Sequence, residues 1–471
     1  MLREAEHSPK KFQRSLFSSF PFLSLFLLLI FLIFPFLSLA LPTHSAFRPH
    51  LLFRTFSIEH GLSQNAVLSI TRDPAGFMWF GTESGLNRYD GYRFTVYLPV
   101  EGDPTSLSNS WVNALLTDRR GRIWVGTENG LNEYNPATDE FIRYFHDPSD
   151  PGSLSSSRIF CLFEDRDGRL WVGTDAGLNL FDRSSRKFVR FLPDPLNPAT
   201  SLSHPTVRAI AQDSAGFLWV ATAGGLNRFD PKVGLSIQFR HDPRDPSSLP
   251  DDYLNCLLID STSGREIIWL GTGSSGLVRF DPSTGQFKTY RRDLPNTPSA
   301  SSDFDSTVLS LTSPPANTIT CLLLDPSGNL WVGTYSGGLA QFSPSREIFV
   351  SYRHRAVDPF SLPDNQIRSL YLSPDGNLWV GTYRGLAQLN FNRQFFIRFL
   401  SDPSDPSTLS NPVVRAFCPH SSGLLFVGTD GGGLNAMNIR LRHAGSSPVR
   451  YFRHQPGFPN SLSSDRIFCL L

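Results

Sequence analysis

A short phrase of the form Trp-x-Gly/Ala-Thr recurs along this chain, and it limits the possible fold more than any other feature. Successive copies are mostly about 45–50 residues apart, a period that is typical of propeller blades or similar repeat arrays. Only the interval between the fifth and sixth copies is clearly longer. The phrase begins at Trp79, Trp124, Trp171, Trp219, Trp269, Trp331 and Trp379, and an eighth copy begins with Phe426 in place of Trp.

Each repeat reads as four short strands, and the second copy shows this well. Its apolar runs are Val112–Asp118, Arg122–Thr127, Leu131–Asn135 and Glu140–Phe145, separated by Gly, Asn, Arg and Pro residues. Short runs with such boundaries indicate a meander of antiparallel strands, and helical periodicity is absent. A four-stranded unit cannot cover both of its faces alone, so neighbouring units must stack. The sequence therefore predicts an all-β fold, a β-propeller of four-stranded antiparallel blades.

The residue types inside the repeat fit this stacking. Trp offers a large flat surface to the neighbouring blade, Gly allows close backbone approach, and Thr suits a pleated strand. The third residue of each first strand is small, as expected for a crowded strand near a central axis. These residues are Ser69, Ala114, Cys161, Ala209, Cys256, Cys321, Ser369, Ala416 and Cys469.

Four of the five cysteines therefore occupy equivalent places in different repeats. We expect them to be buried thiols. A disulfide or metal framework is the alternative, since exported proteins permit disulfides. It is disfavoured because a disulfide needs Cα atoms roughly 4.4–6.8 Å apart, and because no CxxC or Cys/His cluster occurs.

Two segments carry a family resemblance. The stretch "NAVLSITRDPAGFMWFGTESGLNRYDGYRF" (65–94) and the connector "HDPSDPGSLSSSRI" (146–159) resemble the two-component regulator propeller repeat. The resemblance implies seven-bladed propellers, often two in succession, on the periplasmic side of hybrid sensor histidine kinases. An immunoglobulin-like domain, a membrane helix and the kinase core typically follow in that family. It also implies that oligosaccharides are plausible ligands.

On this basis we expect three regions. Residues 1–46 form a signal peptide or signal anchor, residues 47–405 a seven-bladed propeller, and residues 406–471 the truncated first blade of a second propeller. A single eight-bladed ring is the alternative. Leu51–Ser57 could supply a strand that closes the ring, and the Ser/Thr/Pro-rich segment 294–317 is expected to be a surface loop. The chain stops inside a ninth first strand, which suggests a fragment of a longer product.

The N-terminus predicts export. Phe17–Leu41 has no charged residue and follows several basic ones, so the remainder of the chain should cross the membrane. Ser38–Ala40 offers a small-x-small cleavage site, yet the apolar stretch is long enough to span a bilayer. We favour a cleaved signal, with a retained anchor as the alternative. Either way we expect a periplasmic or otherwise extracytoplasmic location, tethered to the cytoplasmic membrane.

Charge and motifs disfavour several functions. The net charge is +1, from 43 basic and 42 acidic residues, so no cationic field would attract nucleic acid. Motifs of hydrolases, zinc proteases and nucleotide-binding loops are missing. Asp165–Arg169, "DRDGR", superficially resembles a calcium loop but fits a hairpin turn better. Recurring histidines such as His146 and His241 lie in connectors between repeats. We predict no catalytic residue, no metal and no cofactor.

The weakest prediction concerns ligand binding. The residues that follow each Gly/Ala-Thr vary while their frame stays fixed, which is how repeat proteins build binding surfaces, although ordinary drift in exposed turns gives the same pattern. The candidates are Glu83, Glu128, Asp175, Tyr335, Tyr383, Arg384 and Asp430.

Three functions remain open from the sequence. The first is a non-catalytic sensor that binds a small molecule or oligosaccharide, acts on a downstream kinase module of the full-length chain and could form a homodimer. The second is a propeller enzyme of the streptogramin-lyase or quinoprotein type. The third is a protein-interaction scaffold.

Overall fold

The computed structural model describes residues 51–198, 200–262, 264–292, 310–391, 399–403, 408–438 and 449–470. The chain divides into two compact units, residues 49–400 and a second unit that includes residues 401–471. The predicted N-terminal segment, residues 1–46, lies outside the described residues.

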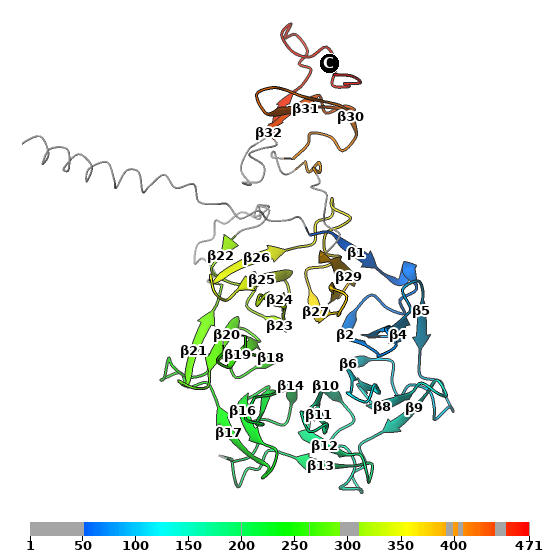
Figure 1. The fold of residues 1–471 in the computed structure, drawn as a ribbon, viewed down its shortest axis with the longest axis vertical. Helices are drawn as coiled ribbons and strands as arrows, with labels where there is room; N and C mark the ends of the chain where they lie inside the picture. Colours follow the sequence, from blue (N-terminus) through cyan, green and yellow to red (C-terminus); the bar gives the residue numbers. More distant parts are fainter. Residues whose placement is uncertain are drawn as a thin grey trace, which may run out of the picture. The chain divides into compact units, whose positions relative to one another are not determined.

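The larger unit contains seven antiparallel sheets of mostly four strands, here called blades 1 to 7 (Figure 1). The first strands are β2 (Val67–Arg72), β6 (Val112–Thr117), β10 (Ile159–Glu164), β14 (Val207–Gln212), β18 (Leu254–Asp260), β23 (Ile319–Leu324) and β27 (Ile367–Leu372). The second strands, which contain the tryptophans, are β3 (Met78–Thr82), β7 (Ile123–Thr127), β11 (Leu170–Thr174), β15 (Leu218–Thr222), β19 (Ile267–Thr272), β24 (Leu330–Thr334) and β28 (Asn377–Thr382).

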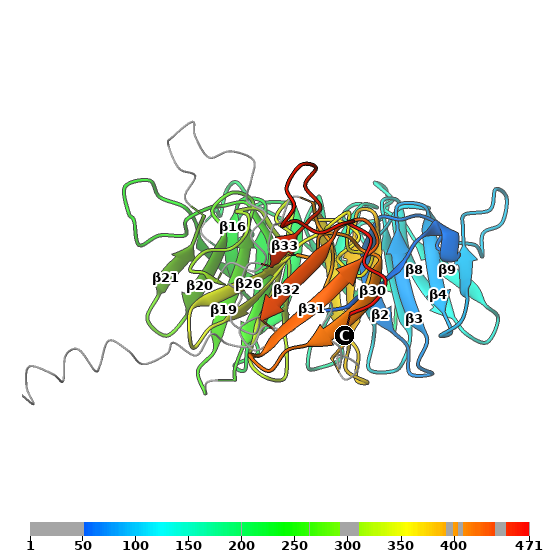
Figure 2. The ribbon, with the colours of Figure 1, turned by 90° about the horizontal axis from the view of Figure 1, so that it is seen from above.

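The third strands are β4 (Gly85–Tyr89), β8 (Gly130–Asn135), β12 (Leu178–Asp182), β16 (Gly225–Asp230), β20 (Leu277–Asp281), β25 (Leu339–Ser343) and β29 (Gly385–Asn390). The outer strands are β5 (Phe94–Tyr97), β9 (Glu140–Tyr144), β13 (Lys187–Phe191), β17 (Leu235–Phe239), β21 (Gln286–Tyr290) and β26 (Ile348–Tyr352). Seen edge-on, the strands of each blade cross the thickness of the ring (Figure 2). The predicted four-stranded propeller blade is confirmed.

Blade 7 takes its outer strand from the other end of the repeat region. β1 (Phe53–Phe56) pairs antiparallel with β29, with Thr55 opposite Ala387. A single 3-10 turn, η1 (Ile58–His60), follows β1. At the inner edge β2 contacts both β6 and β27, and Ser369 Oγ donates to the Val67 carbonyl (3.2 Å). Blade 7 therefore adjoins blade 1, and the closing strand expected within Leu51–Ser57 is confirmed.

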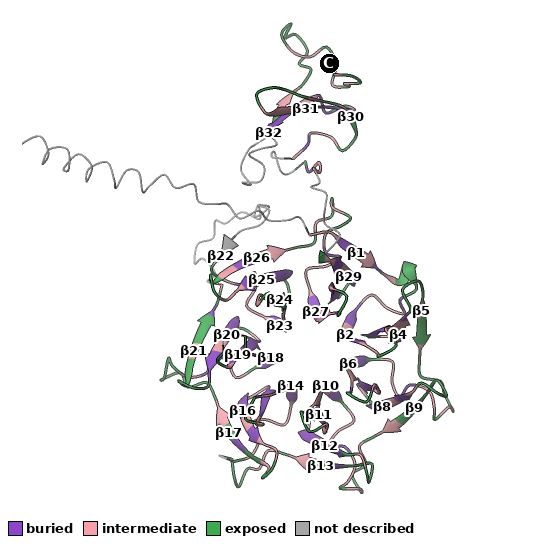
Figure 3. Cartoon of the chain, viewed as in Figure 1, coloured by how far each residue is buried: buried purple, intermediate pink, exposed green. Residues whose placement is uncertain are grey.

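Neighbouring blades are joined by apolar cores centred on the tryptophans. Trp124 of blade 2, for example, packs with Leu154, Ile159 and Phe181 around blade 3. Trp379 of blade 7 packs in the same way against Phe80 and other residues of blade 1. The second strands are buried along their whole length, whereas the outer strands are only partly buried (Figure 3). The predicted role of Trp as the surface for the next blade is confirmed.

The small residues of the first strands are explained by the glycine that faces them. A Cβ built on Gly173 would lie 2.4 Å from Cys161 Sγ and 2.7 Å from Val207 Cγ1 of the next blade. A glycine opposite a small side chain leaves room for this apolar contact between blades. Cys161, Cys256 and Cys321 are accordingly partly buried in the ring, and this loss of solvent raises the pKa of all three thiols.

Two expectations need correction. Cys469, which we expected to be buried, is exposed, because it lies in the irregular segment after the bridge between Asp430 and Arg466 and not in a strand. The segment 294–317 is not loop throughout: its residues 294–309 lie outside the described part, but β22 (Ser310–Leu311) pairs with β26 and adds a fifth strand to blade 6.

The second unit contains one described sheet, formed by β30 (Val414–Pro419), β31 (Leu424–Thr429), β32 (Leu434–Asn438) and β33 (Arg450–Phe452). It has the strand order of a blade, and Phe426 occupies the position of the tryptophan. That it begins a second propeller stays a prediction.

No helix in the described part of the chain has the length and apolar character needed to cross a membrane.

Candidate functional site

The turns between second and third strands, where the sequence placed its candidate residues, are fixed by the threonine of each phrase. Thr127 Oγ1 donates to the Gly130 carbonyl (2.8 Å) and accepts from the Asn129 N–H (3.1 Å). Thr82 makes the same bond to Gly85 (2.9 Å). The sequence explained this threonine by its fit to a pleated strand, but its hydroxyl group holds the turn. Variable side chains are therefore presented on a rigid frame.

These turns share one face of the ring with the connectors between blades, because successive strands run in opposite directions. We call it the connector face, and the face that carries the other two turns of each blade the hairpin face. Backbone bonds tie most of these turns to a connector: Tyr335 N donates to the Thr318 carbonyl (3.0 Å) and Tyr383 N to the Gln366 carbonyl (3.1 Å). The connector face is thus built from similar turns that are bonded to the connectors beside them.

Two of the predicted residues meet at one arginine. Tyr335 of blade 6 is 50% exposed and Tyr383 of blade 7 is 44% exposed. The Arg368 guanidinium lies 5.6 Å from the Tyr335 ring centroid and 5.9 Å from that of Tyr383. Both distances fit cation–π contacts. Two exposed tyrosines from adjacent blades are therefore held beside a cation.

The other candidates within the ring have different surroundings. Glu128 forms an ion pair with Arg158 (2.7 Å) and accepts a hydrogen bond from Asn113 (2.8 Å). Arg384 pairs with Asp364 (3.4 Å). Glu83 and Asp175 occupy the same turn position in blades 1 and 3 and are partly buried.

Asp430 does not belong to this group, because it lies in the second compact unit. Arg415 donates to its carboxylate (2.7 Å), and Arg466 lies 3.3 Å from it. The hydrogen bond from Arg415 lowers the pKa of Asp430 below its ordinary value.

The sequence reasoning missed a second cluster on the connector face. The Arg208 guanidinium of blade 4 lies 5.4 Å from the Phe160 ring centroid and 5.3 Å from that of Tyr253. Its Nε is buried, and no described residue accepts a hydrogen bond from it. Tyr253 is half-exposed, as is Trp111 at the corresponding position of blade 2. Two features of the sequence could have revealed this cluster. One is an arginine as the second residue of a first strand ("TVRAI", "QIRSL"), and the other is an aromatic residue immediately before a first strand.

This arrangement can recognise a polar ring compound or an anion. Aromatic side chains such as Tyr253 and Tyr335 offer flat faces for stacking, and a guanidinium group donates paired hydrogen bonds to carboxylate oxygens. His204 lies in the connector before blade 4, and burial, with a smaller effect of Arg240, lowers its pKa. Among the described residues, no group of three or more His, Cys, Asp or Glu side chains could hold a metal ion.

The hairpin face carries a different chemistry, a repeated bond from tryptophan to aspartate. Trp124 Nε1 donates to Asp118 Oδ2 (3.1 Å) and Trp171 Nε1 to Asp165 Oδ2 (2.8 Å). Arg169 also donates to Asp165 (2.7 Å), so the predicted hairpin turn at "DRDGR" is confirmed. The aspartates that accept from tryptophan in this way are Asp73, Asp118, Asp165, Asp213, Asp260 and Asp325.

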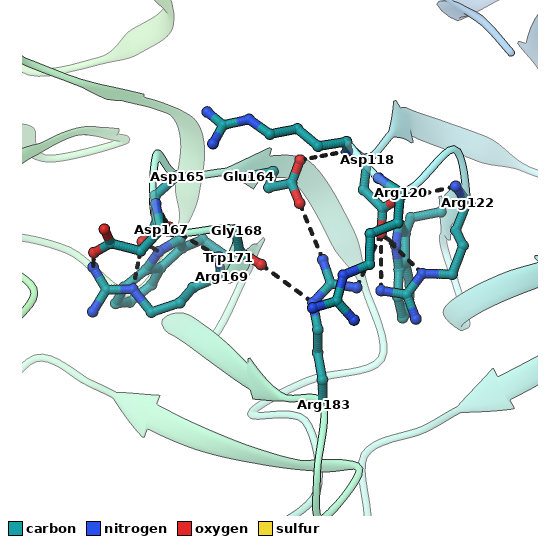
Figure 4. A network of polar contacts seen from close by, with 12 residues as sticks. Asp118, Arg120, Arg122, Glu164, Asp165, Asp167, Gly168, Arg169, Trp171 and Arg183 are labelled. Carbon is teal, nitrogen blue, oxygen red and sulfur yellow. Dashed lines mark hydrogen bonds and ion pairs between the residues drawn. The ribbon is translucent and has the colours of Figure 1, made fainter. Parts of the chain in front are cut away.

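Between blades 2 and 3, further charged side chains join the aspartate in a buried ion network (Figure 4). Arg183 of blade 3 donates to Asp118 Oδ2 of blade 2 (2.9 Å), to Glu164 Oε1 (3.2 Å) and to the Gly168 carbonyl (3.2 Å). Arg122 contacts the same Asp118 oxygen (3.0 Å). Because Arg183 of blade 3 pairs with Asp118 of blade 2, the network joins two blades and has a structural role.

The chain is similar to a known repeat family and to several known proteins. The model of the two component regulator propeller matches residues 61–84, 106–129, 153–176, 201–224, 313–336 and 361–384. Each match runs from a connector to a turn of the connector face. Histidine kinase P4 of Formosa agariphila is 43% identical over 56 residues, which is 12% of this chain and 4% of that protein.

Solved structures share the fold. The extracellular domain assigned to a hybrid two component system of B. thetaiotaomicron, BT3049, is 26% identical, with a TM-score of 0.69 over 89% of this chain. This chain covers only 50% of that domain. Virginiamycin B lyase of Staphylococcus aureus, at 11% identity and a TM-score of 0.50, covers 72% of this chain and shares the fold alone. Two component regulator propeller repeats are therefore found in this chain.

Proposed function

We propose that this chain is the extracytoplasmic, ligand-binding region of a two-component sensor histidine kinase, and that it is not itself catalytic. The repeats that match the family model and the likeness to the extracellular domain from B. thetaiotaomicron support this proposal. The short match to a histidine kinase agrees with it. The chain would stay tethered to the cytoplasmic membrane, and the kinase module would be part of the full-length protein.

The ligand binds at the connector face of the ring. The observation that carries this assignment is Arg208, whose guanidinium lies between the rings of Phe160 and Tyr253 and whose buried Nε has no acceptor among the described residues. A buried donor without a partner is costly, so a ligand that supplies an oxygen acceptor gains affinity there.

An oligosaccharide with an acidic group is the ligand class that fits best. Exposed aromatic rings at Tyr253, Tyr335 and Tyr383 stack on the apolar faces of sugar rings, and Arg208 pairs with a carboxylate. Binding at the seams between blades would change how the sensor's two copies associate and so would bias the kinase. The homodimer is part of this proposal.

A binding screen tests the site. Neutral and uronate-containing oligosaccharides are added to the purified full chain, and affinity is measured by calorimetry. We expect an acidic oligosaccharide to bind and Arg208→Ala or Tyr253→Ala to weaken it about tenfold or more, which corresponds to the loss of one charged hydrogen bond. Tyr92→Ala, at an outer turn of the hairpin face and 95% exposed, is the matched control and should bind normally. If all three variants bind like the parent chain, the connector face is not the site.

A further inference from the structure

A second feature lies on the hairpin face, away from the proposed ligand site. A half-open cavity of about 220 Å³ separates blade 4 from blade 5. It is smaller than the ~300–1,000 Å³ typical of pockets for drug-sized ligands, so it suits a single chemical group. Its lining includes Asp213, Trp219, Arg228, Glu266, Ile268 and Pro282.

At the junction between blades 2 and 3, Arg183 occupies the place that corresponds to this cavity. Its guanidinium contacts two carboxylates, Asp118 (2.9 Å) and Glu164 (3.2 Å), as Figure 4 shows. Arg183 follows Asp182, the last residue of a third strand. The equivalent residue of blade 5, after Asp281, is Pro282, which cannot make these contacts.

The two carboxylates nevertheless recur at the junction of blades 4 and 5. Asp213 corresponds to Asp118, and each accepts a hydrogen bond from the tryptophan of its blade (3.0 and 3.1 Å). Glu266 replaces Glu164, although it comes from a different part of its blade. Glu164 accepts from the N–H after Asp118 (2.7 Å), and Glu266 accepts from the N–H after Asp213 (2.7 Å).

Before Arg183 is counted, both junctions contain one more carboxylate than guanidinium. Between blades 2 and 3 these groups are Asp118, Glu164 and Glu133 with Arg122 and Arg186. At the cavity they are Asp213 and Glu266 with Arg228. Arg122 lies 3.0 Å from Asp118, whereas Arg228 Nε lies 3.8 Å from Asp213 Oδ2, beyond hydrogen-bond distance. Among the described residues, Asp213 Oδ2 therefore accepts a hydrogen bond from Trp219 alone.

We propose that the cavity between blades 4 and 5 binds a guanidinium group supplied by another molecule, in the place that Arg183 takes between blades 2 and 3. A planar guanidinium presents several N–H donors in a fixed fork and can reach Asp213 and Glu266 together. A primary ammonium is a compact point charge and cannot span both carboxylates as well. The guanidinium belongs either to a small guanidino compound or to an arginine side chain of a protein partner.

Calorimetry on the full chain tests the proposal with agmatine, an acetylated Gly-Arg-Gly amide peptide and 1,5-diaminopentane. We expect a guanidinium probe to bind. We expect 1,5-diaminopentane, which has an ammonium group where agmatine has its guanidinium, to bind at least about tenfold more weakly. If agmatine binds and the peptide does not, the source is a small molecule; if the peptide binds, the cavity accepts an arginine side chain. If neither guanidinium probe binds, the proposal is wrong.

Variants locate the binding site. Pro282→Arg should fill the cavity from within and abolish binding of the guanidinium probe, and Glu266→Gln should weaken it about tenfold. Pro231→Arg is the matched control, because Pro231 follows the third strand of blade 4, whose junction with blade 3 has Gln212 at the position of Glu164. It should leave binding unchanged. Unchanged binding to Pro282→Arg would overturn the proposal.

A rescue experiment supplies independent evidence. Arg183→Ala should open a matching cavity between blades 2 and 3 and lower the midpoint of thermal unfolding, since two buried carboxylates lose a partner. Agmatine should recover part of the lost midpoint, and 1,5-diaminopentane should recover less. If agmatine raises the midpoint of Arg183→Ala no more than 1,5-diaminopentane does, two carboxylates in this frame do not select a guanidinium group.

Discussion

The contact between Gly173, Cys161 and Val207 shows how single residues set the distance between blades. A Cβ on Gly173 would overlap both partners, one from its own blade and one from the next. Blade 4 solves the same problem differently: Ala221 replaces the glycine, and Ala209 replaces the cysteine opposite it. The two alanines together occupy a volume similar to that of the glycine and cysteine pair. A close-packed interior tolerates exchanges that conserve volume.

Burial should protect the cysteines of the ring from thiol reagents. Burial raises the pKa of Cys161 and Cys321 to about 12, so both remain neutral thiols at pH 8, whereas the thiolate is the reactive form. Cys469 is exposed. With iodoacetamide at pH 8, followed by mass spectrometry, we expect Cys469 to be alkylated while Cys161 and Cys321 react only after denaturation in urea. Equal alkylation of all three in the native chain would show that the ring thiols are accessible.

Residues whose role repeats in every blade could be predicted from the sequence, and residues whose role depends on a neighbour could not. Trp124 and Gly126 recur in a fixed phrase, so their packing followed from the repeat. Arg208 contacts Phe160 and Tyr253, which lie in the blades on either side, so its surroundings exist only once the blades are stacked. The hydroxyl bond of Thr127 was missed because strand propensity already explained that residue.

At the scale of elements, polar clusters attach each connector to its blade. Asn132 of β8 accepts a hydrogen bond from Ser108 N (2.9 Å) and donates to Ser108 Oγ (2.9 Å) and to the Val125 carbonyl (3.1 Å). Ser108 Oγ also contacts Thr127 Oγ1 (3.1 Å). Asn87, Asn179 and Asn227 make the same bonds to Ser63, Ser155 and Ser203. The asparagine therefore links the connector, the second strand and the third strand.

Removal of this asparagine should lower the free energy of unfolding by more than the volume of its side chain suggests. In Asn132→Ala the Ser108 N–H and the Val125 carbonyl lose their partner in a buried site, so the free energy of unfolding should fall by about 1–3 kcal/mol or more. Urea unfolding followed by tryptophan fluorescence measures this. Asn109→Ala is the control in the same connector, because Asn109 accepts a single exposed hydrogen bond, from Trp111 N (2.9 Å). Similar losses in both variants would mean that the buried cluster adds no stability.

The whole ring depends on a strand that is distant in sequence from the blade it completes. β1 and β29 are more than 300 residues apart, yet Phe56 of β1 lies in the core shared by blades 7 and 1. The sequence allowed this prediction because strand-like residues precede the first repeat, and their pairing with the last blade would remove an open edge. The fifth strand of blade 6 could not be foreseen, since β22 follows a segment with no repeat pattern.

Loss of the Phe56 side chain should therefore destabilise the ring as a whole. Phe56 is 2% exposed and stacks on Trp379 (5.8 Å between ring centroids), with Tyr89 of blade 1 at 5.5 Å. Removing a buried aromatic ring typically costs about 3–5 kcal/mol, so Phe56→Ala should lower the free energy of unfolding by roughly that amount in urea. Tyr92→Ala, on an exposed turn of the same unit, should change it by less than about 0.5 kcal/mol. Because Phe56 joins the outermost strand of blade 7 to blade 1, a cost in Phe56→Ala no greater than in Tyr92→Ala would mean that the ring holds together without its closing strand.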